Sequence, residues 1–447
     1  MQCQVVKFFC CLALLVTAFS GAMTRADVGA VVPTPSAPSS GWEAGGTARL
    51  QIEAHSSAQG EVISSYIPYF QDIGRFFWSW DPKKQPKKTS PTDGELLEPA
   101  FSINELMRNL FVEFDLSDTA HFRKVWFKPT ASMQFRGLLG IHDFVKKRPL
   151  IILRMGIHGN VDEMIAERFI AKLIYEELDA NFLALESLTS HAFLSKNKNI
   201  SFGGVDEGMQ SFLAMQELSK SSIGNLVSSL HMVGLSMGSH GTFITALLDQ
   251  QNGHKLKSIV NFCPLINLQE NMEFHAGNGF SKVLVDAWNV RRLRAIFEIY
   301  HGEPALDGWW KSMFDFKPRF TPSILILLNR DRSKPLLSVD QMSELVPGMK
   351  WPVALADHLR NSKSFFELNN FWPAYQGVKI PMMIYTTPKD PLVINELNAE
   401  RIFAGKQPGD FTSLKYKRLE HGIHCGLPAV YRWEYIAQLL RDGLQLP

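Results

Sequence analysis

Gly234-Leu235-Ser236-Met237-Gly238 follows the apolar run Leu230 to Val233 and precedes a stretch of helical character, Ser239 to Asp249. A G-x-S-x-G pattern between a strand and a helix predicts a nucleophile elbow, a tight turn with a serine at its apex. Such a turn holds its serine in a strained backbone conformation, and side chains at the flanking glycines would clash with the adjacent strand and helix. The sequence context therefore makes Ser236 the candidate nucleophile.

A serine hydroxyl is a poor nucleophile at neutral pH and needs a histidine to take its proton and an acid to orient that histidine. Asp390 follows a buried-strand pattern, Lys379 to Thr387, and lies past its carboxyl end, where parallel sheets place functional groups. The next strand pattern, Phe411 to Leu419, leads to two histidines. His424 lies deeper in the loop and is the preferred base, with His421 as the alternative.

Other residues compete for these roles. Asp331, after an apolar run, is an alternative acid, but it belongs to what reads as an inserted segment. Asp390 precedes a proline, and aspartates in such positions often only form turns. His240 comes one helical turn after Ser236, so we expect it to pack behind the elbow and not beside the hydroxyl.

The negative charge that develops on a tetrahedral intermediate needs backbone N–H donors, and losing one typically costs about 2.7–4 kcal/mol. The N–H of Met237, directly after the candidate nucleophile, is the first expected donor. The second should come from the loop after the strand Pro149 to Arg154. That loop reads Met155-Gly156-Ile157-His158-Gly159-Asn160.

Over roughly Arg123 to Leu444, with an insertion, the chain resembles the α/β-hydrolase superfamily. Many members carry His-Gly-x-x-Gly in this loop, with the donor after the first glycine. The residues Met155 to Gly159 fit that pattern without a gap, although methionine replaces the usual histidine. The resemblance implies that Ile157 is the second donor, whereas a register shifted by three residues would make it Asn160.

Strand patterns alternate with helix patterns along most of the chain, which predicts a mostly parallel central sheet with helices on both faces. The expected strands are Arg123 to Lys128, Met133 to Ile141, Pro149 to Arg154, Asn181 to Glu186, Leu230 to Leu235, Lys257 to Phe262 and the two that precede Asp390 and His424. The expected helices are Val161 to Glu176, Val205 to Leu218, Ser239 to Gln250, Asn395 to Ala404 and Ala429 to Asp442.

The pattern breaks between Pro264 and Val378, which is too long for a loop without structure of its own. Helix-like stretches at Lys282 to Ile299 and Ser338 to Leu345 predict a mainly helical cap between the sixth and seventh strands. Its many aromatic residues either face a hydrophobic substrate or form the cap's own core. The expected organisation is a signal peptide at 1–26, a linker at 27–46, an N-terminal extension packed on the core at 47–120, the core at 121–263, the cap at 264–378 and the rest of the core at 379–447.

The N-terminus has the features of a secretory signal: Lys7, the apolar run Phe8 to Phe19, and small residues before cleavage sites after Ala22 or Ala26. The apolar run is short for a membrane span, which takes about 20 residues. We therefore expect an exported protein, periplasmic or secreted, with an uncleaved membrane anchor as the alternative. Aromatic residues beside lysines near Trp78 are expected to pack on the core, and peripheral membrane contact is the less favoured interpretation.

Two cysteines lie beyond the expected signal peptide, Cys263 and Cys425, each after a predicted strand at the same end of the sheet. In an oxidising compartment they could pair. The two strands should not be adjacent, however, and a disulfide needs Cα atoms within about 7 Å. Two free thiols are the preferred expectation.

The net charge of +2 and the absence of a basic stripe, zinc-type cysteine spacing or a glycine-rich phosphate loop argue against nucleic-acid binding. No cofactor or metal is implied. The expected function is a serine hydrolase that cleaves a small or lipid-like carboxylic ester through Ser236, Asp390 and His424. A peptidase or amidase of the same fold, or a non-catalytic binding protein that retains it, are the alternatives, and the sequence does not specify an oligomeric state.

Overall fold

The structure is a computed structural model of the whole chain. It describes Trp42, 46–53, Phe114, Leu116, 118–157, 159–162, 164–197, Asn199, Ser201, 203–277, 333–388, 390–406, 410–420, Gly422, 424–425 and 433–446. The expected signal peptide, nearly all of the linker, most of the N-terminal extension and the helix expected at Lys282 to Ile299 lie outside these residues.

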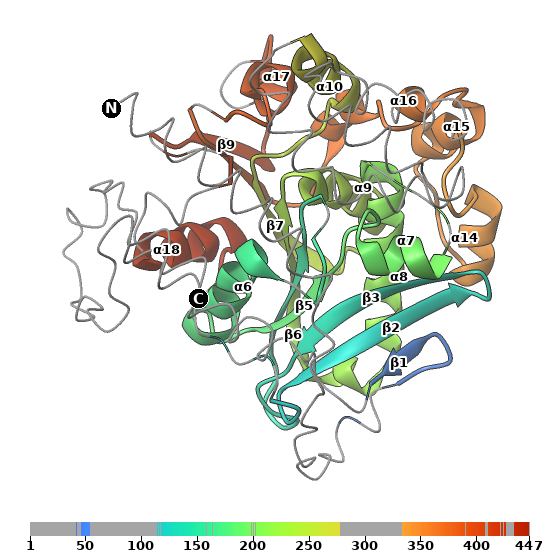
Figure 1. Cartoon of the computed structure of the whole chain (residues 1–447), viewed down its shortest axis with the longest axis vertical. Helices are drawn as coiled ribbons and strands as arrows, with labels where there is room; N and C mark the ends of the chain where they lie inside the picture. The colour runs from blue at the N-terminus through green and yellow to red at the C-terminus, as the bar shows by residue number, and fades with distance from the viewer. Residues whose placement is uncertain are drawn as a thin grey trace, which may run out of the picture.

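One nine-stranded sheet runs through the molecule in the order β1-β2-β3-β5-β4-β6-β7-β8-β9 (Figure 1). Neighbours from β1 through β3 to β5 pair antiparallel, and all later pairs are parallel. The strands are β1 (Leu50–Ile52), β2 (Phe122–Thr130), β3 (Met133–Gly140), β4 (Arg148–Arg154), β5 (Asn181–Leu185), β6 (Val227–Leu235), β7 (Leu256–Phe262), β8 (Met382–Thr386) and β9 (Leu414–Arg418).

Helices cover both faces of this sheet, as the alternating pattern predicts. In β4, Leu150 and Ile152 join one hydrophobic core, while Ile151 and Leu153 join the other. The helices α8 (Gly204–Lys220) and α9 (Met237–Gln251) pack in the first core, and α6 (Ile165–Lys172) and α18 (Trp433–Leu444) in the second, on opposite sides of the sheet in Figure 1. The other helical segments are α7 (His191–Asn197), α10 (Leu268–Gly277), α14 (Val339–Leu345), α15 (Val353–Asn361), α16 (Phe365–Leu368), α17 (Ala399–Phe403), the π-helical η1 (Leu173–Glu177), and the 3₁₀ segments η2 (Ser222–Leu226), η3 (Trp372–Gly377) and η4 (Asn395–Leu397).

All eight expected strands are present, and none of their ends shifts by more than three residues. The structure adds β1, a three-residue edge strand that is paired with β2 and is not among the expected strands. Expected strand Lys379 to Thr387 begins only at Met382, because Pro381 lacks the N–H that a ladder needs. Because β1 adds one strand to the count, the cap region expected between the sixth and seventh strands lies between β7 and β8.

Asparagines shorten one expected helix and divide another. The helix expected from Val161 begins at Ile165, because the Asn160 side chain accepts the N–H of Asp162 at 2.6 Å and forms a turn there. Asn395 to Ala404 is divided into η4 and α17 at Asn398, whose backbone leaves the helical region. The Asn398 side chain instead accepts the N–H groups of Ile266 and Asn267, both at 2.9 Å.

The described part of the expected cap is helical, and α14 coincides with the expected helix at Ser338 to Leu345. Ser338 caps α14 through a capping box with Gln341. Val339 and Met342 of α14 and Leu355 of α15 belong to the same hydrophobic core as the sheet. These two helices are thus built onto the main domain.

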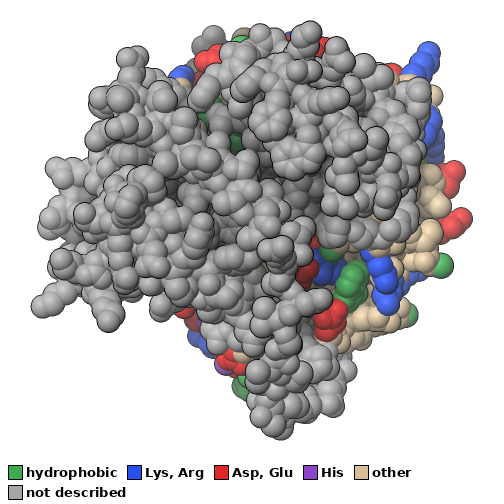
Figure 2. Space-filling view, in the orientation of Figure 1, with side chains coloured by type: hydrophobic (Ala, Val, Ile, Leu, Met, Phe, Trp, Pro, Cys, Tyr) green, Lys and Arg blue, Asp and Glu red, His purple; other side chains and the backbone are tan. Residues whose placement is uncertain are grey.

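Within the described residues, no helix is both long and apolar enough to span a bilayer. The described surface visible in Figure 2 carries Lys and Arg side chains close to Asp and Glu side chains. This mixed charge agrees with the small net charge of the sequence.

Candidate active site

The parallel register gathers four loops at one edge of the sheet. Because β6, β7, β8 and β9 run in the same direction, their carboxyl ends meet there. Ser236 directly follows β6 and Cys263 directly follows β7. Asp390 and His424 lie in the loops after β8 and β9. This is the edge at which open parallel sheets bind their ligands.

Ser236 occupies the strained turn that the sequence predicts. Its backbone has φ 52° and ψ −117°, in a region that residues other than glycine rarely adopt. Its N–H donates to the carbonyl oxygen of Phe262 at 2.9 Å, and its own carbonyl accepts from Ser239 at 3.1 Å and from Leu265 at 3.2 Å. The side chain is buried at the N-terminus of α9. Strain of this kind concentrates at functional sites, where surrounding bonds hold it in place.

Both glycines of the elbow are required by close backbone approach, which confirms the steric prediction. A Cβ at Gly238 would lie 2.3 Å from the carbonyl oxygen of Met155 and 2.5 Å from that of Arg154. A Cβ at Gly234 would lie 2.6 Å from the Cα of Ser239. Real Cβ atoms do not approach backbone atoms this closely, so the turn can form only with glycine at these positions.

His424 and Asp390 form a hydrogen-bonded pair. Nδ1 of His424 lies 2.8 Å from Oδ2 and 3.0 Å from Oδ1 of Asp390. The Asp390 side chain is 1% exposed, whereas that of His424 is 17% exposed. Asp390 Oδ1 also accepts the N–H groups of Leu392 and Val393, at 2.9 and 2.8 Å. The loop after β8 therefore fixes the carboxylate, and the carboxylate fixes the imidazole.

The charge of Asp390 controls the protonation of this histidine. Burial alone would lower the pKa of His424, but the charge and hydrogen bond of the Asp390 carboxylate, with a smaller contribution from Cys263, raise the pKa above its ordinary value. An imidazole held through Nδ1 presents Nε2 to a reactant and accepts a proton there.

A shared hydrogen-bond acceptor connects this pair to the elbow. The carbonyl oxygen of Phe262 accepts the Ser236 N–H at 2.9 Å and the Cys425 thiol at 3.3 Å. Cys425 directly follows His424, so the histidine loop lies against the turn that carries the serine. The structure thus brings Ser236, Asp390 and His424 to one small region from three separate loops.

The loop after β4 contacts the elbow at Gly156. A Cβ there would lie 3.6 Å from Cβ of Ser236 and 3.4 Å from the carbonyl of Leu235. Ile157 is partly buried against a cluster that includes Met237. Asn160, the alternative donor, is buried, and its carbonyl accepts the N–H of Met164 at the start of α6.

The remaining sequence candidates fall into two groups. His240 is fully buried behind the elbow, with its ring 5.6 Å from that of Tyr375, as expected. His421 and Asp331, and His158 in the β4 loop, lie outside the described residues.

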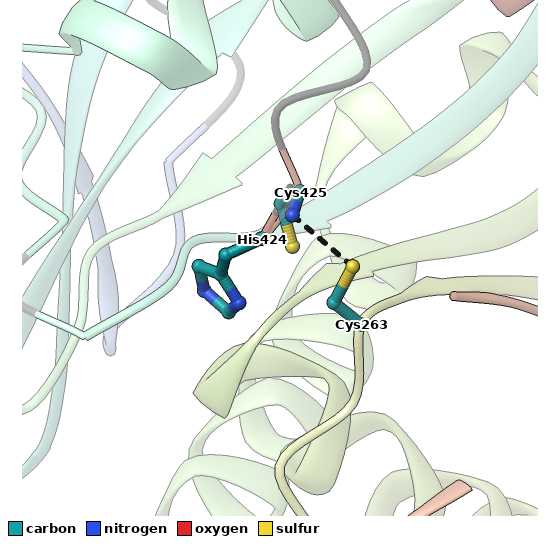
Figure 3. Close-up of side chains that lie close together, drawn as sticks. All are labelled: Cys263, His424 and Cys425. Atoms are coloured by element: carbon teal, nitrogen blue, oxygen red, sulfur yellow. Dashed lines mark hydrogen bonds between the residues drawn. The ribbon is translucent and has the colours of Figure 1, made fainter. Parts of the chain in front are cut away.

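Two cysteines that are not among the predicted site residues also lie beside His424. Cys263 and Cys425 are free, and their sulfur atoms and a ring nitrogen of His424 lie within 4.8 Å of one another (Figure 3). Their common position after strands at one sheet edge was the available signal. The order of the strands puts β8 between them, but the loop after β9 reaches back to the end of β7, where the Cys425 N–H donates to Cys263 Sγ.

No family model matches this sequence, and no curated protein matches it. Similar solved structures include a candidate hydrolase from Legionella pneumophila, with 14% identity over 78% of this chain and 95% of that chain and a TM-score of 0.45. Lipase A from Candida antarctica is 13% identical over 68% of this chain and 73% of its own, with a TM-score of 0.40. Est1E from Butyrivibrio proteoclasticus is 13% identical over 71% and 95%, with a TM-score of 0.37.

The fold is an α/β-hydrolase fold. The order of the strands, the antiparallel β2, β3 and β5 pairs followed by parallel pairs, and a serine elbow between β6 and α9 define it in this chain. The expectation drawn from the resemblance in sequence is confirmed at the level of fold.

Proposed function

We propose that the protein is a serine hydrolase that cleaves carboxylic esters. The observation that carries this proposal is the Asp390–His424 pair, held at 2.8 Å beside a serine in a strained elbow. A buried carboxylate that orients a histidine near a serine is the constellation that activates a hydroxyl for acyl transfer.

In this mechanism Ser236 Oγ attacks the ester carbonyl while His424 Nε2 takes its proton. The N–H groups of Met237 and Ile157 bind the oxyanion, and Asp390 stabilises the imidazolium that forms. The proton then passes from His424 to the leaving alcohol, which leaves an acyl group on Ser236. Water, deprotonated by His424, releases the acid and restores the serine. The close approach of Gly156 to Ser236, where an added Cβ would lie 3.6 Å from the Ser236 Cβ, supports Ile157 over Asn160 as the second donor.

The surroundings of the elbow support a substrate with a hydrophobic acyl part. Met237 belongs to an apolar cluster that also contains Ile157, at the proposed oxyanion site. Phe366 is partly buried against the same cluster. The other members, all buried, are Leu194, Leu265, Leu268, Met272, Phe365 and Val393. Apolar residues around a few placed polar groups are typical of small-molecule sites.

Export to the periplasm or the exterior remains part of the proposal and rests on the N-terminal sequence, with Lys7 before the apolar run Phe8 to Phe19. Mass spectrometry of the mature protein tests it. A new N-terminus after Ala22 or Ala26 supports export, and an intact N-terminus in the membrane fraction supports the anchored alternative.

A fluorophosphonate tests the activity, because it forms a stable adduct only with an activated serine. We expect one adduct on Ser236 by mass spectrometry of the full chain, absent in Ser236→Ala. Ser239→Ala, at a serine buried in α9 whose hydroxyl bonds the Phe262 carbonyl, is the matched control and should still be labelled. Absence of an adduct on folded protein would favour the non-catalytic alternative.

A panel of esters and amides with matched acyl chains then distinguishes the remaining alternatives. We expect turnover of esters to exceed that of amides, with kcat/KM rising as the acyl chain lengthens. Amides hydrolysed as fast as esters would instead identify a peptidase or amidase of this fold, because the triad chemistry is shared.

A further inference from the structure

Two cysteines and the candidate catalytic histidine converge beside the elbow (Figure 3). Cys263 comes from the end of β7, and His424 and Cys425 come from the loop after β9. One ligand atom from each lies within 4.8 Å of the other two. The Cys425 N–H donates to Cys263 Sγ at 3.1 Å, which is the type of bond that stabilises a thiolate.

The geometry points to a binding site for a thiophilic divalent cation, Zn²⁺ or Cd²⁺, formed by the Sγ atoms of Cys263 and Cys425 and a ring nitrogen of His424, whose occupancy blocks the hydrolase. This inhibition rests on the proposed function, because an imidazole bound to a metal cannot take the proton of Ser236 in the proposed geometry. The binding site itself does not depend on the activity.

The donor set suits zinc. Zn–S bonds of ~2.3 Å and Zn–N bonds of ~2.0 Å in a tetrahedral site place the ligand atoms roughly 3.5–3.8 Å apart. Ligand atoms within 4.8 Å need to move together by only about 1 Å. Three protein ligands leave a fourth position for water, as in open zinc sites.

The surroundings of the histidine favour a metal as well. Asp390 holds the His424 imidazole through Nδ1, at 2.8 Å. A carboxylate hydrogen-bonded to the imidazole of a metal-binding histidine fixes the ring and raises its basicity. Two thiolates balance the charge of the dication.

Both cysteines have a backbone conformation that is unusual for residues with only a packing role. Cys263 has φ 46° and Cys425 has φ 43°, both in the left-handed region that side chains other than glycine rarely adopt. Cys263 is held there by its N–H, which donates to the Tyr385 carbonyl at 2.8 Å. Strain at two neighbouring thiols beside a site indicates that their placement has a use.

Access and proton balance are consistent with binding. Cys425 and His424 are partly exposed, while Cys263 is buried beneath them. Burial, together with the hydrogen bond and charge of Cys263, raises the pKa of the Cys425 thiol well above its ordinary value. The metal must therefore displace that proton, and no electron transfer is involved.

Binding is measured by titrating Zn²⁺ into the reduced, full-length protein in competition with a chromophoric chelator. We expect one tight equivalent, weakened at least ~10-fold in Cys263→Ser, in Cys425→Ser and in Asp390→Asn. His254→Asn is the matched control, because His254 is exposed and precedes β7, at the opposite end from Cys263. Equal affinity in the control and in the cysteine variants would overturn the proposal.

Co²⁺ provides a readout on the unmodified chain that does not depend on whether the variants fold. We expect a near-ultraviolet thiolate-to-cobalt charge-transfer band and visible bands of a tetrahedral ion. A cobalt complex without the thiolate band would overturn the site. So would a Cys263–Cys425 disulfide in the protein as isolated whose reduced form binds neither metal.

The inhibitory step is measured as the rate of fluorophosphonate labelling of Ser236 at rising Zn²⁺ occupancy. We expect labelling to fall in proportion to occupancy and to return on chelation, each variant being compared with its own metal-free rate. Metal binding to a protein that no fluorophosphonate labels would support the site and overturn the proposed function. Labelling that is unaffected by bound Zn²⁺ would overturn the inhibition.

Discussion

Asp390 and His424 lie 34 positions apart in the chain, yet both carboxylate oxygens of Asp390 contact Nδ1 of His424, at 3.0 and 2.8 Å. Two backbone N–H groups, of Leu392 and Val393, hold the carboxylate in place. The pair is therefore rigid before substrate arrives, which is the condition for a histidine to meet a serine hydroxyl in one tautomer.

Asp390→Asn should leave this geometry nearly intact and remove the charge. The amide can present its N–H to Nδ1, so that the histidine adopts the wrong tautomer. The corresponding change in a serine protease lowers kcat by ~10⁴-fold, and we expect a loss of that order in ester hydrolysis. Thermal unfolding is the control, since a fall in kcat without a matching fall in folded protein separates catalysis from stability.

The pH dependence of kcat/KM reports the same pair. His424 must be neutral to accept a proton, and its pKa lies above the ordinary value of ~6.5 because Asp390 outweighs the effect of burial. Activity should rise with pH through an inflection above ~6.5 and then level off. In Asp390→Asn the residual activity should inflect at lower pH. A wild-type inflection below ~6.5 would contradict the role given to Asp390.

Gly238→Ala tests the steric basis of the elbow. The added Cβ would meet the carbonyl oxygens of Arg154 and Met155, which belong to β4 and the loop after it and cannot rotate away. We expect a destabilisation of ~1–3 kcal/mol or more in urea unfolding, and loss of fluorophosphonate labelling. At Gly377 an added Cβ meets no described atom within 4 Å, so Gly377→Ala should retain both properties.

Local sequence patterns predicted the strands and the elbow, because these depend on neighbouring residues. The run before Gly234 is apolar since β6 is buried on both faces, and the glycines record a steric constraint that no other residue satisfies. Side-chain bonds over long distances were not predictable in this way. Asn398 breaks a helix because it bonds Ile266 and Asn267, more than 100 positions away in the sequence.

The site was predictable to the extent that strand ends meet at one edge. That rule selected Asp390 and His424, which the structure does bring together. The proximity of Cys263 to Cys425 depends instead on how the loop after β9 crosses β8, and strand order alone does not determine a loop path. The short β1 was missed because three residues give too little alternation to identify.

His240 gives a prediction about acid stability that is independent of the proposed activity. Its ring is fully buried, and neither ring nitrogen has a hydrogen-bond partner among the described residues. Burial lowers the pKa of His240 to about 3. Between this value and the unfolded pKa of ~6.5, the unfolded chain binds a proton that the folded chain does not. Stability should therefore be lost as pH falls through this window, by up to ~1.4 kcal/mol per pH unit from this residue.

His240→Phe removes the titrating group and keeps a ring at the site. Its stability at pH 7 can change in either direction, because the ring lies tightly against Gly204, but the slope of unfolding free energy against pH should become shallower. Urea unfolding at several pH values between 6.5 and 4.5 measures that slope. His254→Asn, at an exposed histidine with positive φ that asparagine tolerates, keeps His240 and should keep the wild-type slope. Burial also lowers the pKa of His231, to about 4, but this histidine is present in all three proteins and contributes equally to their slopes. Equal slopes in wild type and His240→Phe would therefore show that His240 is not the acid-sensitive group.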